Sequence, residues 1–316
     1  MNRRLTTLLV GGGGFIGSHF ARLLTARGNR NVIVTGRRAV PRFALPDDVI
    51  YLQGDVANLS FMEPLFERCD EVVDLAYDTV PKSSFEDPVN DVIGNLPAAV
   101  RLLSLSSRSK LRRVLMVSSG GTVYGNAAYL PIDESHPTDP ISPYGITKLA
   151  IEKYALMFHK HEGLPAVIVR PGNPYGPDQL GGLGQGFIGT AMFATLRRQP
   201  VKIFGERGTI RDYIYIEDLV EGLLAALEHG EVGGVYNIGT GIGLDNRAML
   251  DAFELVVRPY GFSVDVEVYP SRSFDVFANV LNSSRLTEVS GWTPKMSFES
   301  GLSKTWSWAM AIGAAK

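Results

Sequence analysis

A glycine-rich turn near the N-terminus places the strongest limit on how this chain can fold. Residues 5–10 form a strand-like apolar run, residues 11–17 read Gly-Gly-Gly-Gly-Phe-Ile-Gly, and a helical pattern follows. Gly11, Gly14 and Gly17 have the spacing G-x-x-G-x-x-G. Glycines in such a turn let the backbone approach a pyrophosphate, and the free N–H groups of the following helix point at its negative charge. A strand before the turn and a helix after it predict a dinucleotide-binding unit.

Strand-like and helical segments alternate along the chain after this turn. Further strand-like runs occupy residues 31–35, 49–53, 71–76, 113–117 and 166–170. This alternation predicts an α/β fold with a doubly wound parallel sheet. In such sheets ligands bind beyond the carboxyl ends of the strands. The polar loop at 77–84 and the hydroxyl-rich and glycine-rich segment 118–125 therefore fall where a ligand is expected.

The end of the second strand leaves the identity of the dinucleotide open. A fold that prefers NAD usually carries an acidic residue there, whereas this chain has Arg37 and Arg38. An arginine at this place suits the 2′-phosphate of NADP, but both could equally be solvated loop charges that stack on the adenine. Asp55, after the third strand, could accept a hydrogen bond from the adenine amine. Asn95, among apolar residues of a helix at 87–108, is either part of the cleft floor or an ordinary buried amide.

A second motif, Tyr144-x-x-x-Lys148, predicts acid–base chemistry. It follows Pro143 in a segment with helical apolar spacing, so the two side chains lie one turn apart. A phenol loses its proton near pH 10, and a nearby ammonium lowers that value. A reduction of about 3 units needs roughly 4 kcal/mol of differential stabilisation, which Lys148 and a cationic nicotinamide ring together could supply. The alternative is a surface tyrosine and lysine that merely share a helix.

Composition excludes several classes of function. The net charge of −2 gives no general attraction to nucleic acid or to an anionic membrane. No apolar run approaches the about 18 residues of a membrane span, and the first residues do not have the pattern of a signal peptide. The lone Cys69 cannot form an internal disulfide, which favours the reducing cytoplasm. The scattered histidines predict no metal site.

Taken together, the motifs resemble the extended short-chain dehydrogenase/reductase family, in particular the NAD-dependent nucleotide-sugar epimerase/dehydratase branch that includes the UDP-glucose 4-epimerases. The resemblance covers nearly the whole chain. Its carriers are residues 11–17, Gly54-Asp55, 118–125, Tyr144 with Lys148, 170–177, 211–218, 237–241, 272–275 and 291–294.

The resemblance implies a role for each matching residue. Tyr144 would take the proton of the sugar 4-hydroxyl, and Lys148 would bind the nicotinamide ribose and lower the pKa of Tyr144. Residues implied to bind the dinucleotide are Gly11, Gly14, Phe15, Ile16, Gly17, Arg37, Arg38, Asp55, Val56, Leu75, Ala76, Tyr77, Asn95, Ser118, Tyr144, Lys148 and Pro171. Residues implied to bind the nucleotide sugar are Lys82, Thr122, Asn173, Gln185, Gly186, Phe187, Arg211, Arg272 and Asp275.

Two departures from the family pattern affect the reaction. Epimerases of this kind usually carry a serine where this chain has Gly120, so Thr122 or Ser119 must supply the hydroxyl. Thr122 is favoured because it keeps strand-like parity with Gly120. The 4,6-dehydratases of the family carry an Asp-Glu pair where this chain has Gly121-Thr122, so water elimination is not expected.

The resulting hypothesis is a nucleoside-diphosphate-sugar 4-epimerase of the UDP-glucose or UDP-N-acetylhexosamine type. It would work through a transient 4-keto sugar with retained NAD, NADP being not excluded. Alternatives are an NADPH-dependent 4-ketoreductase of a nucleotide sugar and a non-catalytic dinucleotide-binding scaffold protein. By analogy, the expected fold is Rossmann-like. Residues 1–175 and a returning segment near 206–240 would bind the dinucleotide, and the remainder of 176–316 would form a smaller α/β substrate domain. A homodimer through helices near 87–108 and 143–161 is also expected.

Overall fold

A seven-stranded parallel sheet forms the centre of the N-terminal part. The computed structural model describes residues 3–180, 186–272 and 275–313 of the 316-residue chain. The strand order is β3-β2-β1-β4-β5-β6-β10, and every neighbouring pair is parallel. The strands are β1 Leu5–Val10, β2 Arg30–Gly36, β3 Ile50–Gln53, β4 Glu71–Asp74, β5 Arg113–Val117, β6 Ala166–Pro171 and β10 Val235–Ile238. The predicted doubly wound parallel sheet is confirmed, as is the return of residues 235–238 to it.

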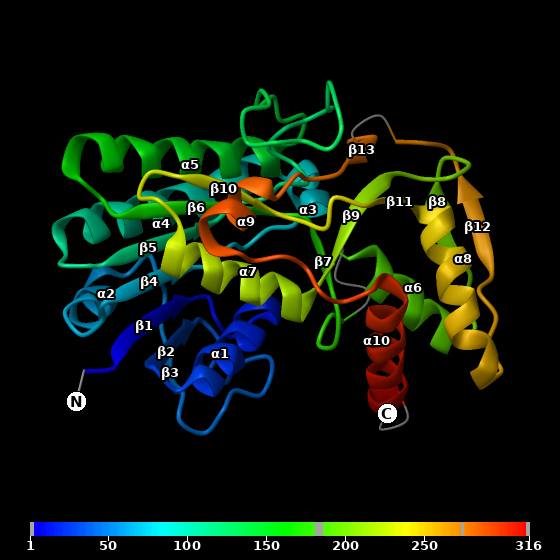
Figure 1. Ribbon diagram of the computed structural model, residues 1–316, viewed down its shortest axis with the longest axis horizontal. Helices are drawn as coiled ribbons and strands as arrows, with labels where there is room; N and C mark the ends of the chain where they lie inside the picture. Colours follow the sequence, from blue (N-terminus) through cyan, green and yellow to red (C-terminus); the bar gives the residue numbers. More distant parts are fainter. Residues whose placement is uncertain (1–2, 181–185, 273–274, 314–316) are drawn as a thin grey trace.

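Helices cover both faces of this sheet (Figure 1). α1 Phe15–Arg27 and α7 Ile216–His229 pack together on one face, and α4 Pro88–Arg108 and α5 Pro143–Glu162 pack together on the other. The short α2 Leu59–Phe66 and α3 Pro81–Glu86 lie beside α4. Alternate strand residues feed two cores, since Leu9 belongs to the α1/α7 core while Leu8 and Val10 belong to the α4/α5 core. Burial on both faces explains why these strands are continuously apolar.

The C-terminal part is a smaller α/β assembly. Its strands are β7 Asn173–Tyr175, β8 Val201–Phe204, β9 Ile210–Tyr215, β11 Gly243–Asp245, β12 Val266–Tyr269 and β13 Ala278–Asn279. Its helices are α6 Phe187–Leu196, α8 Asn246–Val257, η1 Arg258–Tyr260, α9 Ser284–Ser290 and α10 Phe298–Gly313. β9 lies between β11 and β13 and also pairs with β7, while β8 pairs with β12. The division into domains near residue 175 stays a prediction.

Local sequence signals fix the helix that carries Tyr144. Ser142 caps α5, its hydroxyl accepting a hydrogen bond of 3.1 Å from the Gly145 backbone N–H. Pro143 occupies the first turn, where its missing N–H is not needed. Gly163 ends the helix in the left-handed conformation at φ 72°. Tyr144 and Lys148 therefore stand on the first two turns of a well-delimited helix, as the sequence predicts.

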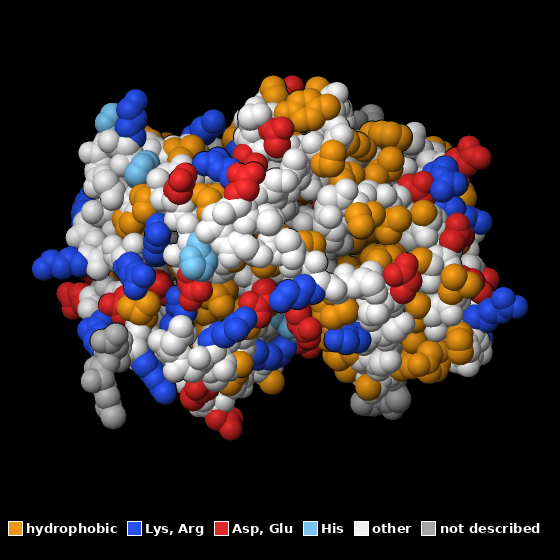
Figure 2. Space-filling model, in the orientation of Figure 1, with side chains coloured by type: hydrophobic (Ala, Val, Ile, Leu, Met, Phe, Trp, Pro, Cys, Tyr) orange, Lys and Arg blue, Asp and Glu red, His pale blue; other side chains and the backbone are white. Residues whose placement is uncertain are grey.

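The surface mixes both signs of charge. The chain carries 31 basic and 33 acidic residues, and Figure 2 shows them interspersed over the face that it draws. Among the described helices, none combines the length and the apolar character that crossing a membrane requires. The described residues also bring no three metal-ligating side chains together in a group that could hold an ion.

Candidate active site

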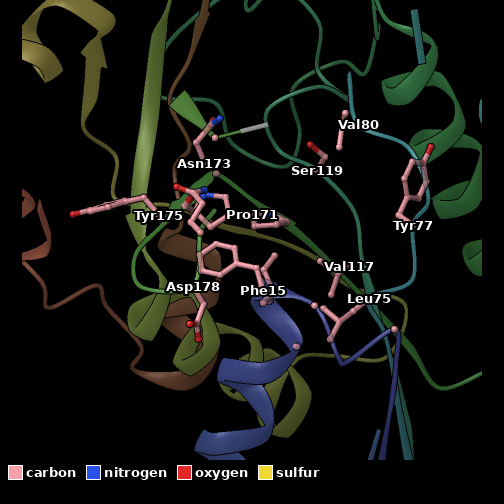
Figure 3. A pocket seen from close by; sticks show the side chains of 18 of the residues that line it. Phe15, Leu75, Tyr77, Val80, Val117, Ser119, Pro171, Asn173, Tyr175 and Asp178 are labelled. Carbon is pink, nitrogen blue, oxygen red and sulfur yellow. The ribbon is translucent and has the colours of Figure 1, made fainter. Parts of the chain in front are cut away.

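A cavity of about 500 Å³ opens at the carboxyl ends of β1, β4, β5 and β6. Figure 3 shows Phe15, from the start of α1, between Leu75 and Val117 on one side and Pro171 and Tyr175 on the other. The cavity brings together these predicted residues: Gly11, Gly14, Phe15, Ile16, Gly17, Leu75, Tyr77, Ser118, Ser119, Tyr144, Lys148, Pro171, Asn173, Gly186 and Phe187. Segments that are far apart in the sequence thus meet where the fold predicts a ligand.

The glycine turn forms a cradle with no room for a side chain at Gly11 or Gly17. A Cβ at Gly11 would lie 2.7 Å from the Ala76 Cα, and one at Gly17 would lie 2.4 Å from the Gly12 Cα. Gly11 also has a φ of 73°, a backbone angle that residues other than glycine rarely adopt. α1 begins after Gly14 without a side-chain cap and without an acidic residue in its first turn. Its first N–H groups are therefore available to a phosphate, and the residues present fit the pyrophosphate of a dinucleotide.

Tyr144 and Lys148 meet inside the cavity. Both are buried, with 8% of each residue exposed. The Lys148 Nζ donates to the Val117 backbone oxygen at 2.9 Å and lies 4.1 Å from the centre of the Tyr77 ring. It also lies 5.9 Å from the centre of the Tyr144 ring, and the Tyr77 and Tyr144 rings pack edge to face at 4.8 Å. An ammonium above an aromatic face is stabilised there, so Tyr77 helps to hold Lys148 beside Tyr144.

Burial determines the protonation of this pair. Desolvation lowers the pKa of Lys148 to about 8, against the attraction of nearby carboxylates, chiefly that of Asp74. Burial also raises the pKa of Asp74 to about 6. The pKa of Tyr144 is raised above its ordinary value, first by burial and then by the negative charge of Asp91. The pKa of Tyr144 is therefore raised in the protein's own environment, and the lowering expected from Lys148 together with a cationic nicotinamide stays a prediction.

A buried polar network lies behind the pair. Glu152, one turn after Lys148 on α5, forms an ion pair with Arg170 at 2.6 Å, and both side chains are almost fully buried. The Ser118 hydroxyl donates to the same carboxylate. Arg170 also donates to the Tyr124 hydroxyl, which donates in turn to Asn237 of β10 at 2.7 Å. The network ties α5 to two strands, β6 and β10, and to the segment that follows β5.

The structure explains the glycine at position 120. A Cβ there would lie 2.5 Å from the Leu281 Cδ1 and 2.9 Å from the Arg170 backbone oxygen. A serine therefore does not fit without a shift of the backbone. Of the two substitutes, Ser119 lines the cavity, whereas Thr122 is not among its lining residues and has a buried Oγ1 without a hydrogen-bond partner. This placement favours Ser119 over Thr122 as the hydroxyl that faces a ligand.

Several predicted dinucleotide-binding residues lie outside the cavity lining. Arg37 pairs with the Asp78 carboxylate, and the Arg38 backbone oxygen accepts from the Tyr51 hydroxyl at 2.8 Å. The Asp55 carboxylate accepts from the Ala57 N–H at 2.9 Å. The two aliphatic residues, Val56 and Ala76, pack against the core that α4 and α5 cover.

Asn95 supports the loop after β4 and does not line the cavity. Its Oδ1 accepts from the Asp78 backbone N–H at 2.7 Å, and its Nδ2 donates to the Thr79 hydroxyl at 3.2 Å. With 5% exposed and both ends bonded, it is a satisfied buried amide that fixes residues which do line the cavity.

The predicted substrate residues divide between two places. Arg272 and Asp275 line a second cavity of about 400 Å³, where they form an ion pair at 2.8 Å and Arg272 lies 4.0 Å from the centre of the Phe204 ring. Arg211 donates to the Val276 backbone oxygen at 2.9 Å, and burial lowers its pKa. Lys82 is an exposed partner of Glu86. Gln185 lies outside the described residues.

Comparison with known proteins identifies the group to which the chain belongs. A family model described as the NAD dependent epimerase/dehydratase family matches residues 7–239. The chain belongs to the NAD-dependent epimerase/dehydratase family. The resemblance drawn from the sequence motifs is thereby confirmed.

Relatives within the family match over nearly their whole length. UDP-glucose 4-epimerase of Mycolicibacterium smegmatis is 31% identical over 307 residues, covering 95% of this chain and 97% of the relative. The structure of a Thermotoga maritima UDP-glucose 4-epimerase with UDP-glucose has a TM-score of 0.91 and 31% identity, covering 98% of this chain and 99% of that one. A Thermus thermophilus UDP-glucose 4-epimerase in complex with NAD gives a TM-score of 0.89 and 32% identity, covering 97% and 99% of the two chains.

Some residues of this family member's site escaped the sequence analysis. Asp91 is fully buried and binds hydroxyls next to Tyr144. Its position four residues before Asn95 places both on one helix face, a signal that could have identified it. Asp178 lines the cavity at a φ of 71° and pairs with Arg22 at 2.9 Å. Neither this backbone conformation nor the pairing has a pattern in the sequence that could have predicted it.

Proposed function

We propose that this chain is a nucleoside-diphosphate-sugar 4-epimerase that acts on a UDP-linked hexose with retained NAD. The observation that carries the proposal is the meeting of Tyr144 and Lys148 in one cavity with the glycine cradle. The chain belongs to this family, and UDP-glucose 4-epimerase relatives match it over nearly their whole length. Together with this group of residues, the match supports reversible oxidation at a sugar carbon as the reaction.

The residues divide the work of the reaction as follows. When bound, NAD supplies a site that accepts a hydride from the sugar and gives it back. Tyr144 takes the proton of the sugar 4-hydroxyl and returns it after the sugar has turned over. Ser119 offers a second hydroxyl from the cavity wall, and Lys148 would hold the ribose of the dinucleotide. The chain's contribution is therefore proton transfer at one oxygen and the positioning of one carbon.

The charges around Tyr144 suit a side chain that takes a proton from the sugar and later returns it. Burial keeps Tyr144 protonated unless positive charge lies beside it, because its pKa is raised in the protein itself. The Lys148 ammonium and an oxidised nicotinamide would both favour the phenolate. With a reduced, neutral nicotinamide beside it, Tyr144 would favour its protonated form and so would hold the sugar proton until a positive charge is again present next to it.

Residues of the second cavity would bind the diphosphate of the nucleotide. Arg272, stacked on Phe204 and paired with Asp275, presents a guanidinium suited to bidentate contact with a diphosphate. Arg211 lies beside it with its charge buried. Asn173, Gly186 and Phe187 line the first cavity, where the sugar would turn over. Asn173 has a buried Oδ1 with no hydrogen-bond partner, which fits a donor from the ligand.

Incubation of purified protein with UDP-glucose or UDP-N-acetylglucosamine, without added cofactor, tests the proposal. Formation of the 4-epimer supports it, and the mass of the dinucleotide released from denatured protein identifies NAD. Strict dependence on added NADPH would instead support a 4-ketoreductase. Arg37 and Arg38 motivate that second candidate, although Arg37 already has a carboxylate partner in Asp78. A protein with neither activity but with bound dinucleotide would be the non-catalytic scaffold.

We also infer that the protein forms a homodimer through α4 and α5. Exposed large apolar side chains on these packed helices include Val89, Val92, Ile93, Ile146, Tyr154 and Met157. Several large apolar side chains exposed on one helix pair favour a protein partner over solvent there. A cytoplasmic location stays a prediction from the single cysteine, Cys69, which is buried and unpaired.

A further inference from the structure

A buried carboxylate lies behind the catalytic pair. Asp91, on the first turn of α4, is 0% exposed. Its Oδ2 accepts from the Thr147 hydroxyl at 2.6 Å, and its Oδ1 accepts from the Thr79 hydroxyl. The Tyr77 hydroxyl lies 3.4 Å from Oδ1. No described Lys, Arg or His nitrogen forms a salt bridge with it, so hydroxyl groups stabilise the charge in place of a cation.

The three hydroxyls come from the parts of the chain that form the site. Thr147 directly precedes Lys148 on α5, and Tyr77 and Thr79 belong to the loop after β4, which lines the cavity. Figure 3 shows the Tyr77 hydroxyl directed away from Phe15 and Leu75. The Tyr77 ring contacts both Lys148 and Tyr144. Asp91 thus joins α4, α5 and the loop at one point directly behind the reacting groups.

We propose that Asp91 is a positioning residue of the epimerase reaction, whose buried charge fixes Tyr77 and α5 and sets the proton balance between Tyr144 and Lys148. This inference rests on the proposed function. The charge opposes loss of the Tyr144 proton and favours the Lys148 ammonium. It therefore favours the protonated form of both side chains, the tyrosine that holds the sugar proton and the lysine ammonium.

Other groups around the pair do not replace this charge. Asp74 faces Lys148 from β4, and Glu152 faces it from α5 but is already paired with Arg170 of β6. The loop after β4 contributes the Tyr77 ring, and α3 contributes the Ser84 hydroxyl, which accepts from the Tyr144 backbone N–H at 3.2 Å. Among the described residues, Asp91 is the one carboxylate whose charge acts on both Tyr144 and Lys148.

The decisive variant is Asp91→Asn, which keeps the shape and removes the charge. In the purified protein, NMR of isotope-labelled dimethyl-lysine should show Lys148 titrating at a lower pH than in the wild type. In the pH profile of kcat/KM for epimerisation, both limbs should move to lower pH, because Tyr144 and Lys148 each lose their protons more easily. A purely structural role would lower the rate or the stability without moving either limb.

A matched control is Asp87→Asn on the same helix. Asp87 is exposed and caps α4 by accepting from the Asn90 N–H at 2.9 Å, a role that asparagine fills equally well. Its charge is screened by solvent, so neither the lysine titration nor the limbs should move. The lysine titration does not depend on turnover. It tests Asp91 even if the wild-type protein proves not to be an epimerase.

A second pair of variants covers the case in which Asp91→Asn does not fold. Thr147→Val keeps the Asp91 charge but removes one hydroxyl that donates a hydrogen bond to it. This variant should lower turnover at least about tenfold, while both limbs of the pH profile stay at their wild-type positions. Thr147→Ser restores the hydroxyl and should restore turnover. Wild-type turnover in Thr147→Val, or an unmoved Lys148 titration in folded Asp91→Asn, would overturn the proposal.

Discussion

At the scale of single residues, the chemistry depends on a phenol whose environment resists ionisation. Tyr144 is buried against Tyr77, and Lys148 is held beside it by the Val117 backbone oxygen. Burial lowers the pKa of Lys148 to about 8, so its charge is lost as the pH rises through that value. Lys148 therefore changes its charge just above neutral pH, whereas the raised pKa of Tyr144 keeps the phenol protonated there.

Tyr144→Phe removes the proton-carrying oxygen and leaves the ring. Turnover should fall by at least about 10²-fold, while binding of NAD and UDP-sugar, measured calorimetrically, stays near the wild-type value. Tyr260→Phe, at an exposed position on η1, serves as the control and should have no effect. Wild-type turnover in Tyr144→Phe would show that another group carries the proton.

Gly120→Ser restores the residue usual in the family, and we expect it to be harmful here. The new side chain would meet the Leu281 side chain and the Arg170 backbone, so the free energy of unfolding should fall by about 1–3 kcal/mol. Gly121→Ser is the control, since a Cβ there meets nothing closer than 3.6 Å. Urea denaturation of the two variants measures the difference, and equal stabilities would contradict the explanation given for Gly120.

At the scale of elements, α5 is held by acidic residues on two sides. Asp91 of α4 binds Thr147 near the start of α5, and Glu152 of α5, five residues further on, binds Arg170 of β6. Both contacts are buried, and each joins the helix to a different layer of the fold. The orientation of Tyr144 and Lys148 therefore depends on polar contacts as well as on the apolar face of the helix.

Glu152→Gln breaks a buried ion pair and leaves the Arg170 charge without its partner. The free energy of unfolding should fall by about 3–5 kcal/mol in denaturant titrations. Glu86→Gln is the matched control, because Glu86 and Lys82 are both largely exposed and 3.8 Å apart. Its effect should stay below about 0.5 kcal/mol. A loss from Glu152→Gln as small as that from Glu86→Gln would show that Arg170 finds other partners.

Sequence patterns predicted elements better than they predicted side-chain partners. The strands at 5–10 and 113–117 and the helix from Pro143 follow from local periodicity and capping. The raised pKa of Tyr144 could not be predicted, because it depends on desolvation and on Asp91, which is distant in sequence. The favoured hydroxyl was Thr122, yet Ser119 lines the cavity, since the segment after β5 leaves strand geometry at Ser118 and parity no longer applies.

At the scale of the whole molecule, the α4/α5 surface suggests how two copies meet. Ile93→Asp should convert a dimer into a monomer, because Ile93 is 67% exposed on α4 and its replacement costs little in a single chain. Leu255→Asp, at a similarly exposed position on α8, is the control and should leave the dimer intact. Light scattering measures the mass. A monomeric wild-type protein would contradict the inferred homodimer.

The order in which the chain leaves the ribosome matters for this architecture. β6, whose six residues are all buried, pairs on its outer side with β10, which is made more than sixty residues later. Until Val235–Ile238 emerge, a nascent chain presents an apolar strand with free backbone groups, the kind of edge that joins other chains. During its synthesis the protein thus passes through an interval in which the sheet is incomplete. In that interval a chaperone, or slow addition of the neighbouring segment, determines whether the sheet is completed or the chain aggregates.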